Sequence, residues 1–379
     1  MRKERSPVPV AVQFAVFCLG AAVSLATSYL LVTRLERIGE RLGLSEALLG
    51  MVAALAADAP EITSAVSALA AHQEKVGAGV IIGSNVFNLA ALLGLGALVA
   101  GRIALHRKVV MLGGTVGLWV AVICLVTTTG SIPPGAGLAA VLAVLLPYLV
   151  LLGAGQARLG RLPVARRWAD WLAVAIHQEE QELGEIIHPA HGRRRDVLVA
   201  GAALAVVVAA SVAMERSATS LGTHFGVPQI ITGGVVLAGV TSLPNAVAAV
   251  YLAARGRGAA MLSTTLNSNT LNVTAGLLLP ATITGLTPSV HSVLIAVWYL
   301  GLTAVSMAVT YRDGGVRRAT GVLIIGSYLV FLGSLLATAQ QSVPGLAGTG
   351  VPLLVTAAGW AAGLARRPGR PPGRGHPGG

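Results

Sequence analysis

The sequence predicts an all-α polytopic membrane protein with two inverted five-helix repeats, which make ten core helices, and an eleventh helix near the C-terminus. Three observations lead to this fold class: the composition, the spacing of charge-free stretches and an internal repeat. The chain has 379 residues, of which 54% are hydrophobic and 11% charged, and its mean hydropathy is +0.76. Soluble domains carry about 25% charged residues, and disordered chains are rich in charge and poor in apolar residues. The composition therefore excludes both classes and favours the lipid bilayer as solvent.

The positive net charge of +12 does not indicate nucleic-acid binding. Only 4% of the residues are aromatic, and Lys and Arg fall between apolar runs rather than on one face. Cys18 and Cys124 lie inside apolar runs, so we expect packed side chains rather than a disulfide framework.

Stretches without Asp, Glu, Lys or Arg indicate membrane spans, because a bilayer core of about 30 Å needs roughly 20 apolar residues per helix. The span over 45–71 differs from the others, since it is interrupted by Asp58 and Glu61. The basic N-terminus before an apolar run could also be a signal peptide, but the run continues to about Val32 and favours a first membrane helix. The charge-free stretches are 6–33, 76–101, 109–157 with a turn at 131–135, 197–214, 217–254, 258–311 divided near 282–292, and 319–365 divided around 340–350.

The expected organisation is repeat 1 over 1–155, a cytoplasmic loop over 156–196, repeat 2 over 197–340, and an extra helix with a basic disordered tail over 341–379. Alternate loops divide the 27 Lys and Arg into 5 on one side and 22 on the other. Since cytoplasmic loops carry the excess of basic residues, the N-terminus is expected outside and the loop and C-terminal tail inside a cell (inner) membrane. The five basic residues of the outer side are Arg2, Lys3, Arg5, Lys75 and Arg216.

The loop has an acidic middle flanked by His177, His188 and His191. A metal-sensing or regulatory role is one interpretation. A solvated amphipathic linker on the membrane surface is the plainer one, and the sequence favours it.

Two segments align without a gap at an offset of 184 residues, within 44–96 and 228–280. Pro60 falls on Pro244, and residues 83–88, Gly-Ser-Asn-Val-Phe-Asn, fall on residues 267–272, Asn-Ser-Asn-Thr-Leu-Asn. The offset covers five helices, and an odd number of spans turns the second copy upside down. Inverted repeats of this kind are typical of secondary transporters, whose binding sites lie near the bilayer midplane.

Asp58 and Glu61 are the acidic residues expected in mid-span. An ionisable group there is costly and normally marks a function, and no Lys or Arg is available in another span to neutralise them. A bound cation is therefore the expected partner. Helix breaks at Pro60 and Pro244 free backbone carbonyls, which a membrane tolerates where they line a cavity. Such hard oxygens suit Ca²⁺ or Na⁺.

Asn85 and Asn88 lie three residues apart and share a helix face, as do Asn269 and Asn272. Their amides, with the hydroxyls of Ser84 and Ser268, can complete a cation shell. Hydrogen bonding between helices is the alternative role for these residues, and it is the more open for Asn88 and Asn272. The glycines at 77, 79 and 83 are expected to allow close helix packing.

These motifs resemble those of the cation/calcium exchanger superfamily, which includes the sodium/calcium exchangers. There each repeat carries Gly-Thr-Ser-x-Pro-Glu and, later, Gly-Ser-Asn-x-x-Asn. Here residues 56–61, Ala-Ala-Asp-Ala-Pro-Glu, and residues 240–245, Val-Thr-Ser-Leu-Pro-Asn, match the first pattern. The resemblance covers about helices 1–10 and implies ten core helices, a cytoplasmic central loop and alternating access.

The sequence also departs from the family pattern. The second acidic ligand is replaced by Asn245, while Asp58 stands where the first repeat has Ser and restores one charge from the other side. Two carboxylates still match one divalent cation. Thr241 and Ser242 keep their hydroxyls, but their counterparts in repeat 1 do not, so sodium sites built from both repeats are in doubt.

The predicted function is a secondary active antiporter that exchanges Ca²⁺, or a similar divalent cation, for Na⁺ or H⁺. We expect no enzymatic activity and no cofactor, with the lipid bilayer and inorganic cations as partners and no nucleic acid. Two alternative functions are compatible with the sequence: an intramembrane enzyme with Asp58 and Glu61 as an acid–base pair, and a non-transporting membrane sensor. The predicted metal ligands are Glu61, Asp58, Asn85, Asn245, Asn269, Thr241, Ser242, Ser84 and Ser268.

Overall fold

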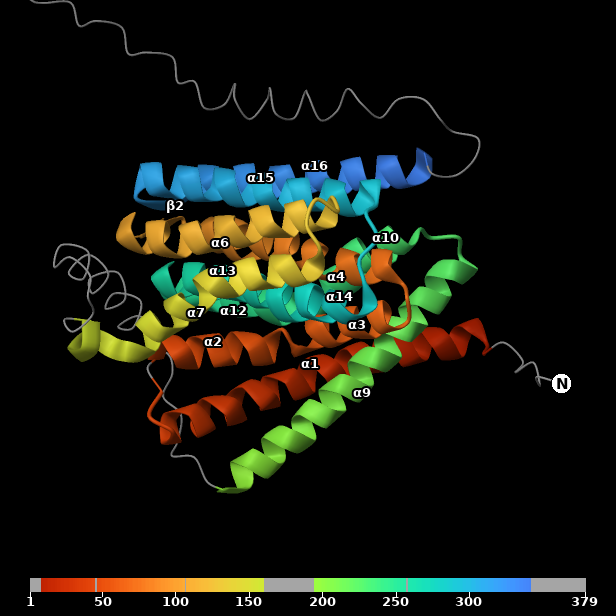
Figure 1. Cartoon of the computed structure of the whole chain (residues 1–379), viewed down its shortest axis with the longest axis horizontal. Helices are drawn as coiled ribbons and strands as arrows, with labels where there is room; N and C mark the ends of the chain where they lie inside the picture. Colours follow the sequence, from red (N-terminus) through yellow and green to blue (C-terminus); the bar gives the residue numbers. More distant parts are fainter. Residues whose placement is uncertain (1–7, 45, 106, 160–193, 257, 342–379) are drawn as a thin grey trace, which may run out of the picture.

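The computed structural model describes residues 8–44, 46–105, 107–159, 194–256 and 258–341. Almost all of these residues are helical, and one short antiparallel strand pair is present (Figure 1). The first part of the chain forms α1 (Val10–Arg41), α2 (Glu46–Ala57), α3 (Ala59–Ala70), α4 (Glu74–Asn88), the π-helix η1 (Leu89–Leu95), α5 (Gly96–Ala100), β1 (Arg102–Ala104), α6 (Arg107–Thr128) and α7 (Pro134–Leu159). The second part forms α9 (Arg194–His224), α10 (Gln229–Ile231), η2 (Thr232–Leu237), α11 (Ala238–Thr241), α12 (Leu243–Ala254), α13 (Gly258–Leu271), η3 (Asn272–Leu278), α14 (Leu279–Thr284), α15 (Val290–Asp313), β2 (Gly315–Arg317) and α16 (Arg318–Gln341).

Six helices of the described chain are long and apolar enough to cross a membrane, or up to eight if each of two bent helix pairs counts as one span. The protein is therefore a helical multi-pass membrane protein. The expected eleventh helix and the acidic, His-containing part of the loop lie outside the described residues, so these expectations stay predictions.

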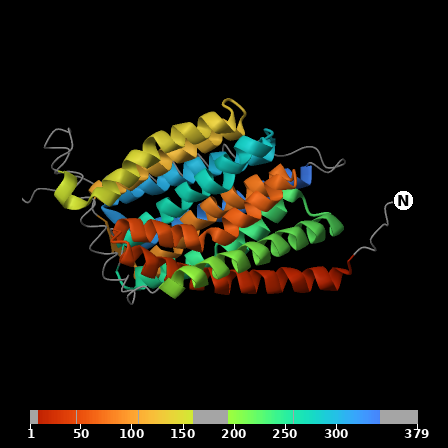
Figure 2. The same ribbon diagram turned by 60° about the horizontal axis from the view of Figure 1, so that its bottom comes forward.

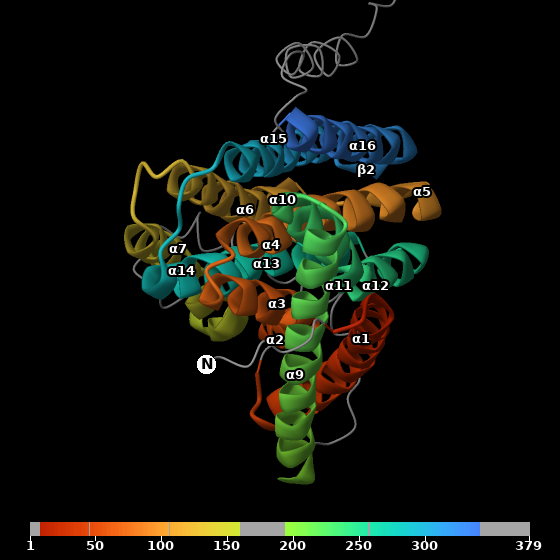
Figure 3. The ribbon, with the colours of Figure 1, turned by 90° about the vertical axis from the view of Figure 1, so that its right-hand side faces the viewer.

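Helices α1 and α9 lie side by side along one flank of the molecule (Figure 2), and α15 and α16 cover the opposite side (Figure 1). Viewed end-on, α3, α4 and α13 lie between these two layers (Figure 3). Gly20 permits the close approach of α1 and α9, because a Cβ placed there would lie 3.0 Å from the carbonyl oxygen of Ala210. The hydroxyls of Ser24 and Ser211 share a hydrogen bond of 2.6 Å between the same two helices.

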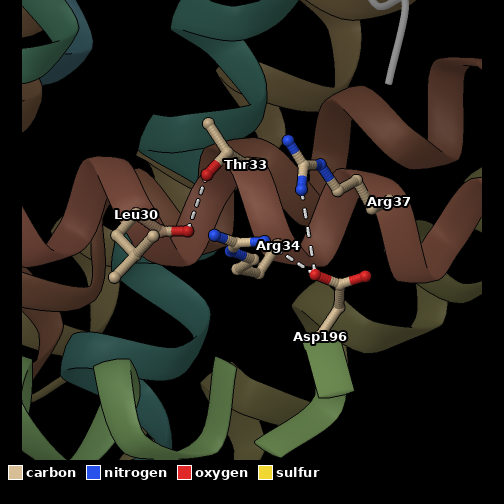
Figure 4. A network of polar contacts seen from close by, with 5 residues as sticks. All are labelled: Leu30, Thr33, Arg34, Arg37 and Asp196. Carbon is tan, nitrogen blue, oxygen red and sulfur yellow. Dashed lines mark hydrogen bonds and ion pairs between the residues drawn. The ribbon is translucent and has the colours of Figure 1, made fainter. Parts of the chain in front are cut away.

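An ion pair joins α1 and α9 near one end. Asp196 Oδ1 lies 2.7 Å from Arg34 Nη1 and 3.8 Å from Arg37 Nη1, while the hydroxyl of Thr33 donates back to the carbonyl of Leu30 (Figure 4). The Asp196 side chain is only 3% exposed, so both basic residues bring their charge to a largely buried carboxylate. The pair fixes the relative height of the two helices.

The charge-free stretch predicted that one span ends at Met214. This prediction is wrong, because α9 continues to His224. The adjacent charges Glu215 and Arg216 indicated a loop, but Glu215 is 1% exposed inside the helix. A carboxylate can stay within the helix here because Ser67 and Thr219 donate hydrogen bonds to it.

Both predicted helix breaks are present. The α2–α3 pair is bent by 53° and the pair that ends in α12 by 43°. Pro60 and Pro244 stand in the first turn of the helix after each break, where a missing backbone N–H leaves no hydrogen bond unmade. The hydroxyl of Ser28 in α1 donates to the carbonyls of Ala56 and Ala57, at 3.0 and 3.3 Å. It thus satisfies carbonyls that the break leaves free.

Helix α4 crosses η2 in direct backbone contact. A Cβ on Gly83 would lie 2.5 Å from the carbonyl oxygen of Gly234, and one on Gly79 would lie 2.9 Å from the nitrogen of Gly234. On Gly77 it would lie 2.7 Å from Leu69 Cγ. The predicted role of the glycines at 77, 79 and 83 in close packing is confirmed.

The strands β1 and β2 pair antiparallel, with Ile103 opposite Val316. They connect the loop after α5 with the loop after α15, two loops that the charge distribution places on the same side. The pair therefore joins the ends of helices that belong to different halves of the chain.

Candidate functional site

The two bent helices meet in a polar cluster inside an otherwise apolar core. In the part of the chain that the structure describes, the buried charged side chains are acidic: Asp58, Glu61, Asp196 and Glu215. Asp58 and Glu61 are both 0% exposed. No buried Lys or Arg accompanies them among these residues, so the pair is held by neutral donors alone.

Asp58 occupies the break itself, as the residue before α3. Its Oδ1 accepts a hydrogen bond of 2.8 Å from Asn245 Nδ2 and one of 2.7 Å from the Ser268 hydroxyl. Both donors belong to the second half of the chain. Its second oxygen, Oδ2, is buried and has no hydrogen-bond partner.

Glu61 lies in the first turn of α3. Its Oε1 accepts a hydrogen bond of 2.6 Å from the Ser242 hydroxyl, and its Oε2 accepts one of 2.6 Å from Asn272 Nδ2. Ser84 also lies against this carboxylate. Its hydroxyl is 0% exposed and has no partner of normal hydrogen-bond geometry.

The asparagines of α4 and α13 bond to each other across the cluster. Asn85 Nδ2 donates to the backbone carbonyl of Asn269 at 3.0 Å, and Asn269 Nδ2 donates to that of Asn85 at 3.2 Å. Asn88 Nδ2 reaches Ser268 Oγ and Asn269 Oδ1, each at 3.2 Å. The exchange between Asn85 and Asn269 is reciprocal because the two residues are 184 positions apart, the offset of the sequence repeat.

Several oxygens of the cluster are buried and unsatisfied: Asp58 Oδ2, Asn88 Oδ1, Asn272 Oδ1 and Ser84 Oγ. The carboxylate and amide oxygens among them can only accept, so a neighbouring N–H or a cation must satisfy them. Buried polar groups are seldom left unpaired. Carboxylate, amide and hydroxyl oxygens are hard ligands of the kind that Ca²⁺, Mg²⁺ or Na⁺ prefer, so these residues fit a cation.

The structure brings most of the predicted ligands together, and all of them are buried. Thr241 is the exception in orientation, because its hydroxyl donates to the carbonyl of Leu237 in its own helix at 2.9 Å. The ligand set as a whole stays a prediction. The residues that contact Asp58 or Glu61, or link those that do, are Ser84, Asn85, Ser242, Asn245, Ser268, Asn269, Asn272 and Asn88.

Sequence reasoning missed two residues near the cluster, Ser64 and Tyr299. The hydroxyl of Ser64, one turn after Glu61, is buried without a partner, and so is that of Tyr299, which lies beside Asn85. Tyr299 comes from α15, outside both repeat motifs, so the motif alignment gave no signal for it. Ser64 follows Glu61 by three residues on α3, and that spacing was a usable signal.

The family comparison gives a match over most of the chain. The model described as sodium/calcium exchanger protein matches residues 12–154 and 196–337. The putative antiporter CaxA of Alkalimonas amylolytica is 36% identical over 83 residues, which cover 22% of this chain and only 26% of that relative. The inner membrane protein YrbG of Escherichia coli (strain K12) is 26% identical over 298 residues, 77% of this chain and 87% of that protein.

Two kinds of solved structure share the fold. The sodium-calcium exchanger NCX_Mj, soaked with 2.5 mM Na⁺ and 10 mM Sr²⁺, is 18% identical with a TM-score of 0.56, covering 86% of this chain and 99% of that one. The H⁺/Ca²⁺ exchanger CAX is 14% identical with a TM-score of 0.63, covering 94% and 86%. At these identities the likeness concerns the fold, but the family match spans both halves of the chain, including every residue of the polar cluster. The chain belongs to the sodium/calcium exchanger protein family.

Proposed function

We propose that this protein is a cation antiporter that binds Ca²⁺, or a similar divalent cation, at Asp58 and Glu61 and exchanges it for Na⁺ or H⁺. The observation that carries the proposal is the buried carboxylate pair without a basic partner among the described residues, surrounded by oxygens that lack hydrogen-bond donors. Two carboxylates match the charge of one divalent ion. One of two close carboxylates can also hold a proton when no cation is bound.

The ligand shell would come from both halves of the chain. Asn245, Ser242 and Ser268 now donate hydrogen bonds to the carboxylates, and they would turn oxygens toward a bound ion. Asn85, Asn269, Thr241 and Ser84 would complete the set. Each Asn side chain carries one oxygen and one NH₂ group, so rotation of the amide converts a donor into a ligand.

The transport cycle would use two inverted repeats of five helices each. Helix bounds support this arrangement: α1 and α9 correspond at the offset of 184 residues, and so do the breaks at Asp58 and Ser242. Rocking of α1 and α9 against the other helices would open the site to alternate sides. The Arg34–Asp196 ion pair and the Ser24–Ser211 hydrogen bond would keep α1 and α9 moving together.

The orientation follows from the charge distribution, with the N-terminus outside and the loop over 156–196 inside a cell membrane. Ten core helices and an eleventh C-terminal helix remain part of this proposal. No observation favours the enzyme or the sensor over transport.

The experiment is a flux assay on purified protein in liposomes, with Na⁺ and pH gradients imposed separately. Ca²⁺ uptake that is driven by an outward gradient of Na⁺ or of H⁺ supports the proposal and identifies the coupling ion. Glu61→Gln, which keeps the shape of the side chain and removes its charge, should abolish the flux. The matched control is Glu40→Gln, since Glu40 is an exposed glutamate in α1. Wild-type flux in Glu61→Gln, or no exchange in either gradient, would contradict the proposal.

A further inference from the structure

Outside the polar cluster, two carboxylates are buried in the described helices, Asp196 and Glu215. Asp196 is paired with Arg34 and Arg37, whereas Glu215 has no such ion pair with any described residue. Glu215 of α9 is 1% exposed. It lies nine residues before the end of α9 at His224, or roughly 13 Å along the helix axis. An isolated carboxylate at such depth is costly in a membrane and normally has a function.

The carboxylate of Glu215 is held by two hydroxyls. Ser67 Oγ of α3 donates to Oε2 at 2.8 Å, and Thr219 Oγ1 of α9 donates to Oε1 at 3.1 Å. Among the described residues no basic side chain lies within 4.0 Å of it, although ion pairs are present elsewhere. Arg216 is the next residue, and its positive charge acts on the carboxylate through space, but its side chain is exposed and forms no ion pair with it.

The elements in closest contact with α9 carry few charged groups near Glu215. These elements are α1, α3, α10 and η2. The stretch of α1 from 10 to 33 has no charged residue, and neither do α10 and η2. On α3 the single charged residue is Glu61, which adds negative charge. Glu215 therefore lacks a fixed counter-charge on any of these elements.

A row of side chains connects Glu215 with the polar cluster. Glu61, Ser64 and Ser67 follow each other at intervals of three along α3, and residues three apart on a helix have Cβ atoms about 5–6 Å from each other. The row advances about 9 Å along the axis from Glu61 to Ser67. Ser64, the middle member, is 0% exposed and its hydroxyl has no partner. The row leads from the cluster toward the end of the molecule where α3 and α9 finish.

We propose that Glu215 is a second binding station, which takes a single positive charge, a proton or Na⁺, on the path between the Asp58–Glu61 pair and that end of the molecule. One carboxylate matches one monovalent ion, as two match a divalent ion. The oxygens of Ser67 and Thr219 are available to either ion, and Ser64 passes it on toward Glu61. The station therefore serves the coupling ion and not the divalent cation. This inference rests on the proposed antiport function.

The test compares two fluxes of reconstituted protein. One is gradient-driven exchange of Ca²⁺ for the coupling ion, measured separately with Na⁺ and with pH gradients. The other is exchange of Ca²⁺ for Ca²⁺ across the membrane, which needs no coupling ion. In Glu215→Gln the gradient-driven flux should fall about tenfold or more, the effect of losing a hydrogen-bonded buried charge. The half-saturating concentration of the coupling ion should rise, while Ca²⁺-for-Ca²⁺ exchange stays within about twofold of wild type, a difference of less than about 0.5 kcal/mol.

Further variants separate an ion station from a structural hydrogen bond. Glu215→Asp should restore most of the gradient-driven flux, because it keeps the charge. Ser64→Ala should lower this flux without lowering the melting temperature by more than a few degrees, and Glu40→Gln serves as the neutral control. If a pH gradient drives Ca²⁺ exchange by the wild type, the station holds a proton. If a Na⁺ gradient drives it, the station holds Na⁺.

The outcomes are distinguishable. If Glu61→Gln abolishes exchange while Glu215→Gln shows the wild-type dependence on the coupling ion, this inference is overturned and the proposed function stands. A parallel loss of both fluxes and of thermal stability in Glu215→Gln also overturns it, in favour of a structural bond. If the wild type performs no exchange in either gradient, the proposed function fails and this inference fails with it.

Discussion

The two helix breaks at the centre of the molecule have the same backbone and opposite electrostatic roles. Asp58 has φ −81° and ψ −3°, and Ser242, at the equivalent position, has φ −85° and ψ 0°. The first break carries the carboxylates of Asp58 and Glu61, whereas the second carries the neutral side chains of Ser242 and Asn245. The hydrogen bonds of 2.6–2.8 Å to the two carboxylates all come from the second half of the chain.

This difference teaches that a duplicated backbone does not require a duplicated site. One half supplies the charge and the other supplies the donors that hold the charge in place. Neither half can make the cluster alone, because a buried carboxylate without donors costs several kcal/mol.

The largest effect is expected from removing a charge from the first break. Asp58→Ser makes this position match Ser242 and leaves Glu61 as the one carboxylate of the pair. A divalent ion would then be bound with one charge uncompensated, and exchange should fall about 100-fold, or about 2.7 kcal/mol. Ca²⁺ flux in liposomes measures it. Normal flux would mean that Asp58 is not a ligand and that the charge asymmetry has no function.

Moving the charge to the second break should reverse much of this loss. In the double variant Asp58→Ser/Asn245→Glu, one carboxylate lies on each side of the cluster. Since Asn245 Nδ2 now contacts Asp58 Oδ1 at 2.8 Å, a carboxylate at 245 falls close to the lost one. Flux should recover to within about tenfold of wild type, a remaining cost of about 1.4 kcal/mol.

The control for this exchange is the single variant Asn245→Glu, which adds a third carboxylate beside Asp58. Like charges at that distance repel, so it should bind Ca²⁺ with a changed pH dependence rather than behave as the double variant. If the double variant is no better than Asp58→Ser alone, the two breaks are not interchangeable in charge.

The contact between the halves at Gly83 also differs from the position that matches it in the sequence repeat. Gly83 lies in backbone contact with Gly234, whereas the equivalent position 267 has room for an asparagine side chain that is 6% exposed. Gly83→Ala should destabilise the protein by about 1–3 kcal/mol, the cost of overpacking a tight contact. Thermal unfolding in detergent is the measurement.

Gly239→Ala is the matched control, because nothing lies within 4 Å of the position where its Cβ would stand. Alanine also has the higher helix propensity, by about 1 kcal/mol relative to glycine. This variant should therefore be neutral or slightly stabilising. Equal destabilisation of both variants would show that the close approach at Gly83 is not the cause.

The sequence was sufficient for the features that depend on local chemistry. Charge-free runs follow the helices because a bilayer has no water for exposed backbone groups, and the breaks follow Pro60 and Pro244. The meeting of the Asp58 and Glu61 carboxylates with the second-half donors was inferred from the repeat and is present in the structure.

The sequence was insufficient where tertiary contacts compensate a local cost. Glu215 was assigned to a loop because charge normally ends a span, and the Ser67 hydroxyl that retains it comes from 148 residues away. Tyr299 could not be found from the sequence, because its place beside Asn85 depends on how α15 packs against α4.

The smallest effect on stability is expected from removing the Ser28 hydroxyl, which donates to carbonyls at the first break. Ser28 donates to the carbonyls of Ala56 and Ala57, whereas the equivalent position in α9 is Val212, which has no hydroxyl. Ser28→Ala therefore makes the first break like the second. A hydrogen bond between membrane helices contributes about 0.6 kcal/mol, so the melting temperature should fall by about one or two degrees.

The control is Ser24→Ala, which removes the bond to Ser211 one turn away and should lower the stability by about the same amount. If α1 moves relative to the breaks, Ser28→Ala alone should also change the exchange rate, by about twofold to threefold. Identical rates in the two variants would show that the bond at the break is static through the cycle.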